Sequence, residues 1–192
     1  MNKARMEAFS DGVIAIIITI MVLDLKAPFG SNFSDLISVL PVFLSYVLSF
    51  TFLGIYWNNH HHLLQAAEYV NGAILWANLH LLFWLSLIPF VTDWMGVNDF
   101  TAKPVALYGF DFLMAAVAYF ILVKVLIAHY GKDSTLAIAI GNGVKEKISV
   151  VLYMAGIALA FIKPVLSCAI YVVVAIMWLV PDRRIEKVIN SN

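Results

Sequence analysis

Six apolar stretches, separated by short polar segments, account for most of this chain. Each is close to the roughly 20 residues that an α-helix needs to cross the hydrocarbon core of a bilayer. The segments between them contain the Gly, Pro, Asn and Asp residues that favour turns. The pattern predicts an all-α membrane protein in which residues 1–192 form one unit of six transmembrane helices, at about 6–25, 36–57, 70–92, 105–128, 146–163 and 165–181.

Composition agrees with a lipid environment, since the chain is 62% hydrophobic and only 12% charged. Its formal net charge of zero gives no reason to expect a nucleic-acid partner. An even number of spans puts both termini on one side. Nine basic residues fall on that side, against Lys26, Lys103 and Lys163 on the other, so the positive-inside rule predicts a multi-pass protein of the cell membrane with cytoplasmic termini. The nine are Lys3, Arg5, Lys124, Lys132, Lys145, Lys147, Arg183, Arg184 and Lys187.

The first apolar stretch is unusual because it carries polar groups at membrane depth. Ser10, Asp11 and Thr19 lie where a signal peptide would be purely apolar. Such groups are costly in lipid unless they face a partner or a water-filled path, so they are functional candidates. At about 100° per residue, Ile16, Thr19 and Leu23 share one stripe of the helix.

Two interpretations of this stripe are open. Around a symmetry axis, it would form an apolar ring, a hydroxyl ring and a second apolar ring along a pore. Alternatively, Ile16 and Leu23 pack against neighbouring helices, and the Thr19 hydroxyl bonds a preceding carbonyl of its own helix.

A short motif opens the same helix. The spacing Arg5-x-x-x-Phe9-Ser10-Asp11, at the start of the first of six spans, resembles the signature of the transmembrane protein 175 family. These proteins are potassium-permeable cation channels of lysosomes and bacteria, and the chain resembles the bacterial members, which have a single six-helix unit. The resemblance implies a homotetramer whose first helices line a central pore. Its partners would be potassium and other monovalent cations, further copies of the chain and the lipid bilayer.

The same resemblance assigns roles along the first helix. It implies a pore constriction at Ile16, a hydroxyl layer at Thr19 and a further apolar layer at Leu23. It also implies that Asp11 and its motif neighbours belong to a structural polar cluster with residues of the second and third helices. We expect the cluster to contain Arg5, Phe9, Ser10, Asp11, Asn78, His80 and Trp84.

Several other polar residues are less informative. Asp24 is either a cation attractor at the pore mouth or an ordinary solvated helix end. The run from Trp57 to His62 is either a polar helix end or part of the cluster around Asp11. Consecutive helical histidines point about 100° apart, so they cannot face one metal ion together. The single cysteine, Cys168, excludes an intrachain disulfide and a metal site of thiolates. Because the chain also offers no convincing nucleophile or metal constellation, we expect no metal site, no cofactor and no enzymatic activity.

The sequence therefore predicts a potassium-permeable, weakly selective cation channel, with a hydrophobic constriction on the first helix as filter and gate. The alternative is a proton-coupled secondary cation transporter that uses Asp11, Asp111 and His80 as a relay. We see no internal repeat and no helix broken by Gly or Pro at mid-membrane, two features that are typical of such transporters.

Overall fold

The computed structural model describes residues 3–65, 67, 69–131 and 143–179. Within these ranges the chain folds into α-helices and one 3-10 helix, without a strand, so the predicted all-α architecture is confirmed. Lys132, Arg183, Arg184 and Lys187, which support the predicted orientation, lie outside the described residues, as does the end of the last predicted span. The orientation of the termini stays a prediction.

Six α-helices are described in this part of the chain. Four spans, with the 3-10 helix η1 counted as part of the second, are long and apolar enough to cross a membrane. The last two helices have 17 and 16 residues, slightly short of the expected span, so their crossing stays a prediction. The elements are α1 (Lys3–Leu23), η1 (Phe33–Val39), α2 (Leu40–Gln65), α3 (Gly72–Val97), α4 (Ala102–Tyr130), α6 (Val144–Ala160) and α7 (Pro164–Leu179).

Two helices extend further than the apolar pattern indicates. α2 continues to Gln65 instead of ending near residue 57, because its polar last turns find partners on α1 and α3. α3 continues to Val97 although Pro89 lies inside it. Proline removes one backbone hydrogen bond and often kinks a helix, but here the helix runs through it.

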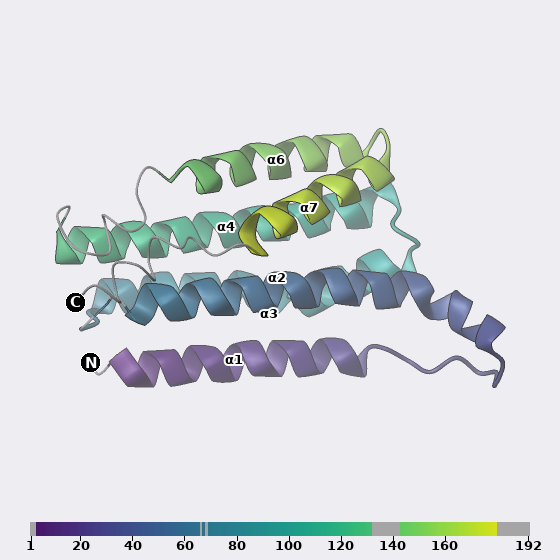
Figure 1. Cartoon of the computed structure of the whole chain (residues 1–192), viewed down its shortest axis with the longest axis horizontal. Coiled ribbons are helices and arrows are strands. Elements are labelled where there is room, and N and C mark those ends of the chain that lie inside the picture. Colours follow the sequence, from purple (N-terminus) through teal and green to yellow (C-terminus); the bar gives the residue numbers. More distant parts are fainter. Residues whose placement is uncertain (1–2, 66, 68, 132–142, 180–192) are drawn as a thin grey trace.

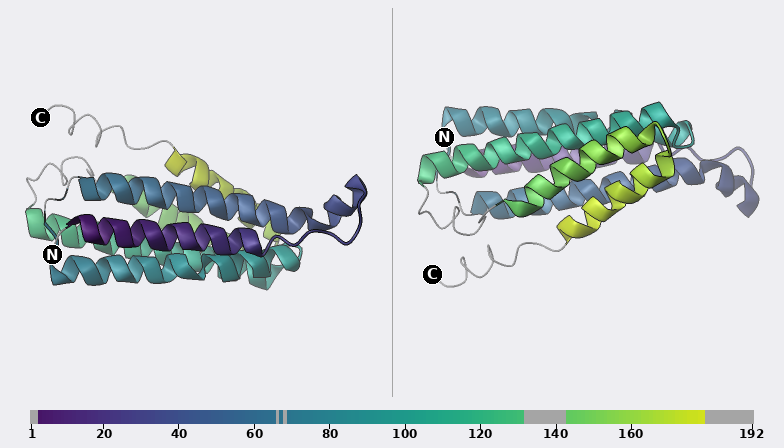
Figure 2. Two further views of the ribbon diagram at one scale, coloured as in Figure 1. Left: turned by 90° about the horizontal axis from the view of Figure 1, so that it is seen from below. Right: turned by 90° about the horizontal axis from the view of Figure 1, so that it is seen from above.

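The helices lie side by side along the long axis of the molecule (Figure 1). α1 is at one edge, α2 and α3 come next, and α4 separates them from α6 at the opposite edge. α1 packs on both α2 and α3, and the view from below shows it lying over the line between them (Figure 2). One face of the first helix is therefore held by two neighbours.

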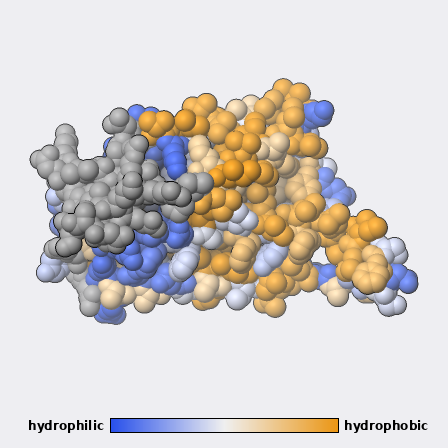
Figure 3. Space-filling model, in the orientation of Figure 1, coloured by the Kyte–Doolittle hydropathy of each residue, from blue (hydrophilic) through white to orange (hydrophobic). Residues whose placement is uncertain are grey.

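The surface of the chain is suited to lipid. Hydrophobic residues cover most of the middle of the face shown in Figure 3, and hydrophilic residues gather towards the ends. Large apolar side chains are exposed on every α-helix, including Phe50, Phe83 and Phe110. Several of the buried residues are polar. This distribution is expected in a bilayer, where polar groups need hydrogen-bond partners inside the protein and apolar groups can face lipid.

Candidate functional site

The first helix presents two different faces. The buried face is almost inaccessible to solvent, and its residues recur every three or four positions, as one side of a helix requires. It packs against α2 and α3. Its members are Met6, Ser10, Ile14, Ile17 and Met21.

The predicted pore stripe lies on the other face of α1. Ile16 is 58% exposed and Leu23 is 77% exposed, so neither packs inside the chain's own bundle. The Thr19 side chain is also exposed, and its hydroxyl donates a hydrogen bond of 2.8 Å to the carbonyl oxygen of Ile16. The hydrogen bond of the second interpretation is thus present at Thr19, whereas Ile16 and Leu23 do not pack against neighbouring helices of the same chain. The stripe is free to face another subunit, lipid or a pore.

A buried chain of polar side chains connects three helices. The Ser10 hydroxyl on α1 donates to the carbonyl of Met6 at 2.9 Å and accepts from the Nδ2 of Asn78 on α3 at 3.0 Å. The Oδ1 of Asn78 lies 2.7 Å from the Nε2 of His60 on α2. Because that amide oxygen can only accept, the imidazole must carry its proton on Nε2. This chain fixes the position of α1 relative to both of its neighbours.

More exposed polar contacts join the same turns of α1 to α2. The indole Nε1 of Trp57 donates to Asp11 at 3.0 Å, and the Nδ1 of His61 lies 3.1 Å from a carboxylate oxygen of Glu7. The rings of Trp57 and His61 stack at a centroid distance of 6.1 Å. We call all of these residues the polar clamp. It comprises Glu7, Ser10, Asp11, Trp57, His60, His61 and Asn78.

The polar clamp overlaps only in part with the predicted cluster. Arg5 and Phe9 are exposed, and no hydrogen bond or ion pair of their side chains occurs among the described residues. His80 accepts a hydrogen bond of 3.0 Å from Trp84, and no described hydrogen bond connects this pair to Ser10 or Asp11. Residues 78 and 80 point about 200° apart on a helix, so only one of them can face α1.

Four members of the polar clamp were not assigned to the cluster by the sequence. They are Glu7, Trp57, His60 and His61. The signal was available in the spacing of Trp57, His60 and His61, since residues three and four positions apart share a helix face. Of the two interpretations left open for the run from Trp57 to His62, Trp57 and His60 follow the one that connects them to Ser10 and Asp11.

The opposite end of α1 carries a second group of charges. Asp24 is half-buried and lines a groove of about 450 Å³ together with Lys26 and Asp93. The other side of the groove is apolar and comes largely from η1 and the start of α2. Two carboxylates and one ammonium therefore lie together where the pore stripe ends.

Asp111 of α4 is buried without a described partner. It is 2% exposed, and neither carboxylate oxygen forms a hydrogen bond within the described part of the chain. The hydroxyl of nearby Tyr108 lies 3.0 Å from the Ser49 hydroxyl instead, and Ser49 is 2.7 Å from that of Thr92. Asp11, His80 and Asp111 are thus held in three different environments.

No group of three or more His, Cys, Asp or Glu side chains in the described ranges could hold a metal ion. Cys168 is half-buried and unpaired in this part of the chain. Neither observation identifies a catalytic constellation.

Comparison with known proteins accounts for the motif on α1. The family model described as the endosomal/lysosomal potassium channel TMEM175 matches residues 5–89, which include the polar clamp and the pore stripe. A potassium channel of Chryseobacterium sp. (strain P1-3) is 55% identical over 192 residues, which is 100% of both chains. The human endosomal/lysosomal proton channel TMEM175 is 40% identical over 75 residues, 33% of this chain and 15% of that protein.

A solved structure extends the similarity to the fold. The crystal structure of a lysosomal potassium-selective channel TMEM175 homolog from Chamaesiphon minutus matches with a TM-score of 0.81 and 29% identity, covering 94% of this chain and 97% of that one. These matches confirm the resemblance that the Arg5 to Asp11 motif indicated. The chain is a multi-pass membrane protein that belongs to the TMEM175 family.

Proposed function

We propose that this chain is the subunit of a homotetrameric, potassium-permeable and weakly selective cation channel of the cell membrane. Bacterial relatives named potassium channels and the family itself support a cation channel and not an enzyme. The observation that carries the finer proposal is the orientation of α1. Its buried face is held by α2 and α3, which leaves the stripe of Ile16, Thr19 and Leu23 exposed and able to line a central pore.

The residue types of the stripe are suited to modest selectivity. Four copies of Ile16 would form an apolar constriction, where each ion must shed part of its hydration shell, and potassium loses water at lower cost than sodium. The same ring would close by dewetting. Thr19 donates its only hydroxyl proton to the carbonyl of Ile16, so its oxygen keeps lone pairs for a passing cation. Leu23 would form the second apolar layer.

The charged and polar groups around the stripe have supporting roles. Asp24, beyond the second apolar layer, would raise the local concentration of cations at the pore mouth. Ser10 and Asp11 would act through position, because their hydrogen bonds to Asn78 and Trp57 set the angle at which α1 stands.

Replacement of Ile16 tests the constriction. We expect Ile16→Asn to wet the narrow ring and to raise sodium flux severalfold relative to potassium flux in proteoliposomes, with little effect on folding. Ile176→Asn on α7 is the matched control, since Ile176 is also 58% exposed but lies far from α1 along the chain and is not part of the pore stripe. Unchanged flux and ion preference in Ile16→Asn would exclude Ile16 as the constriction.

Flux measurements in the same proteoliposomes distinguish the channel from the alternative, a proton-coupled transporter. The transporter would need a relay through Asp11, His80 and Asp111. Asp11 accepts a hydrogen bond from Trp57, and His80 accepts one from Trp84. No hydrogen bond among the described residues connects Asp11 or His80 to Asp111. A channel should carry potassium at a rate set by voltage and little affected by a proton gradient. Strict exchange of one proton for each cation would contradict the channel.

A further inference from the structure

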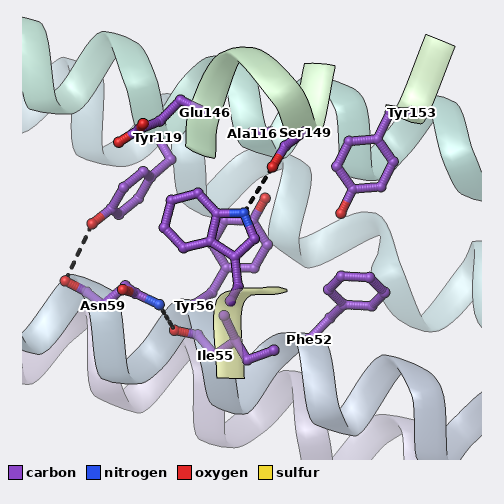
Figure 4. A pocket seen from close by; sticks show the side chains of 10 residues that line it. Phe52, Ile55, Tyr56, Asn59, Ala116, Tyr119, Glu146, Ser149 and Tyr153 are labelled. Atoms are coloured by element: carbon purple, nitrogen blue, oxygen red, sulfur yellow. Dashed lines mark hydrogen bonds between the residues drawn. The ribbon is translucent and has the colours of Figure 1, made fainter. Parts of the chain in front are cut away.

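A second cavity lies between α2, α4, α6 and α7, and α1 contributes nothing to its walls (Figure 4). The space available to the centres of water molecules is about 40 Å³. Since one water needs roughly 10–15 Å³ on this measure, the cavity has room for a small molecule of a few heavy atoms. Five of its ten lining residues are aromatic, namely Phe52, Tyr56, Tyr119, Tyr153 and Trp178.

The ring of Tyr119 meets two other rings of the cavity edge to face. The ring of Tyr119 lies 6.2 Å from that of Tyr56 at 70°, and 6.5 Å from that of Trp178 at 79°. Adjacent walls of an aromatic box have this arrangement, and such boxes bind cations through the negative faces of the rings. Trp178 already attracts one cation, because the ammonium of Lys145 lies 5.9 Å from the centre of its ring.

The polar atoms of the cavity indicate the sign of the ligand charge. Glu146, in the first turn of α6, lines the cavity and forms no ion pair or hydrogen bond among the described residues. The hydroxyls of Tyr56 and Tyr153 likewise have no described partner, although Tyr153 is only 3% exposed and its hydroxyl is turned towards the cavity in Figure 4. The other polar side chains of the lining are hydrogen-bonded within the protein: Tyr119 donates to the carbonyl of Asn59, and Trp178 donates to Ser149. Asn59 and Ser149 in turn donate to backbone carbonyls of their own helices.

We propose that this cavity binds a small alkylammonium ion, with its methyl groups against the rings and its charge beside Glu146. The carboxylate of Glu146 disfavours an anion, whereas the two free hydroxyls can use their oxygen lone pairs to accept from an ammonium N–H. A bare metal cation would need about six oxygen ligands, which these mostly apolar walls do not supply. An alkylammonium ion of a few heavy atoms combines the required charge with apolar surface. It would contact α2, α4, α6 and α7 together, so binding should stabilise the folded protein.

The test uses the whole purified protein in detergent and reads thermal unfolding during titration with trimethylammonium chloride. We expect the unfolding temperature to rise with trimethylammonium but not with equal concentrations of sodium chloride or of tert-butanol, a neutral molecule of the same shape. Glu146→Gln should weaken the apparent affinity about tenfold, and Tyr153→Phe, which removes only a hydroxyl, about threefold. Asp99→Asn, at an exposed acid outside the cavity, is the matched control and should leave the affinity unchanged.

Two results would overturn the proposal. Equal stabilisation by tert-butanol would show a purely apolar pocket, and unchanged affinity in both Glu146→Gln and Tyr153→Phe would place the binding elsewhere. Tyr153→Phe keeps the question open to measurement if Glu146→Gln fails to fold. Because the readout is binding and not ion flux, a negative result here would leave the proposed channel function intact, and a failed flux assay would leave this site intact.

Discussion

Each half of α1 contains side chains whose burial is the reverse of that expected for a soluble helix, which buries apolar groups and exposes polar ones. In the first half, Ser10 is buried and bonded to α3, and Asp11 is bonded to α2. In the second half, Ile16 and Leu23 are exposed although both are apolar. Lipid solvates apolar side chains as well as a protein core does, whereas unpaired polar groups are costly there. Hydrophobicity alone therefore does not decide burial in this helix: Ser10 is buried beside four apolar residues, while Ile16 and Leu23 are exposed.

In the proposed channel, this difference separates the residues that hold the helix from the residues that meet the ion. The polar clamp fixes α1 through bonds to two other helices, so its residues should be sensitive in stability. The pore stripe is exposed and lines the pore only in the proposed channel, so substitutions there should change conduction more than stability. The same substitution should then lower stability when it is made on the buried face and change conduction when it is made on the exposed face.

The largest effect is expected for Ile17→Asn on the buried face. Ile17 is 3% exposed, so the variant buries an amide without a partner and loses apolar contacts with its neighbours. This should cost about 3 kcal/mol and lower the unfolding temperature by roughly 10 °C in detergent. Ile16→Asn, one position away on the exposed face, should lower it by less than about 3 °C. Similar losses of stability in both variants would remove the distinction between the two faces.

A smaller effect is expected for Asn78→Leu in the polar clamp. The variant leaves Ser10 and His60 without their described partner on α3, at a cost of about 2 kcal/mol. The unfolding temperature should fall by roughly 6 °C, and the preference for potassium over sodium should change little. Asn98→Leu is the matched control, because the Asn98 side chain is exposed and its one described hydrogen bond goes to the carbonyl of Trp94 on its own helix.

A double-mutant cycle identifies the bond responsible. Ser10→Ala combined with Asn78→Leu should be less destabilising than the sum of the two single variants by about 1 kcal/mol. Strict additivity would mean that the bond between Ser10 and Asn78 does not hold α1 in place.

Much of α1 could be predicted from its own residues. The motif from Arg5 to Asp11 indicated the family, and the spacing of Ile16, Thr19 and Leu23 placed them on one stripe. These inferences needed only the periodicity of a helix whose start was marked by polar residues. The all-α architecture followed in the same way from the length and polarity of the six apolar stretches.

The partners of Ser10 could not be predicted in this way. Choosing between Asn78 and His80 requires the rotation of α3 about its own axis, and α3 is apolar on almost all sides. An amphipathic pattern reveals the inner face of a soluble helix, but here lipid and protein favour the same residues. Packing against α1 and α4 sets the rotation, and it turns Asn78 inwards while His80 bonds Trp84 on its own helix.

The smallest effect is expected at the far end of α1, where the two proposed roles of the helix meet at Asp24. It is half-buried beside Asp93 and Lys26, yet it directly follows the exposed stripe. If its charge attracts cations, Asp24→Asn should lower potassium flux about twofold at 10 mM salt, where the Debye length is about 30 Å. At 1 M salt the charge is screened within about 3 Å, so the difference should disappear.

Asp99→Asn distinguishes a charge at the pore mouth from general surface charge. Asp99 is exposed in the short connection between α3 and α4, at the same end of the bundle as Asp24. A similar loss of flux in this variant would assign the effect to the whole surface. A fall in stability of Asp24→Asn, with flux unchanged at both salt concentrations, would instead make Asp24 a positioning residue. The division of α1 would then be between its two ends and its centre, with only Ile16, Thr19 and Leu23 left to meet the ion.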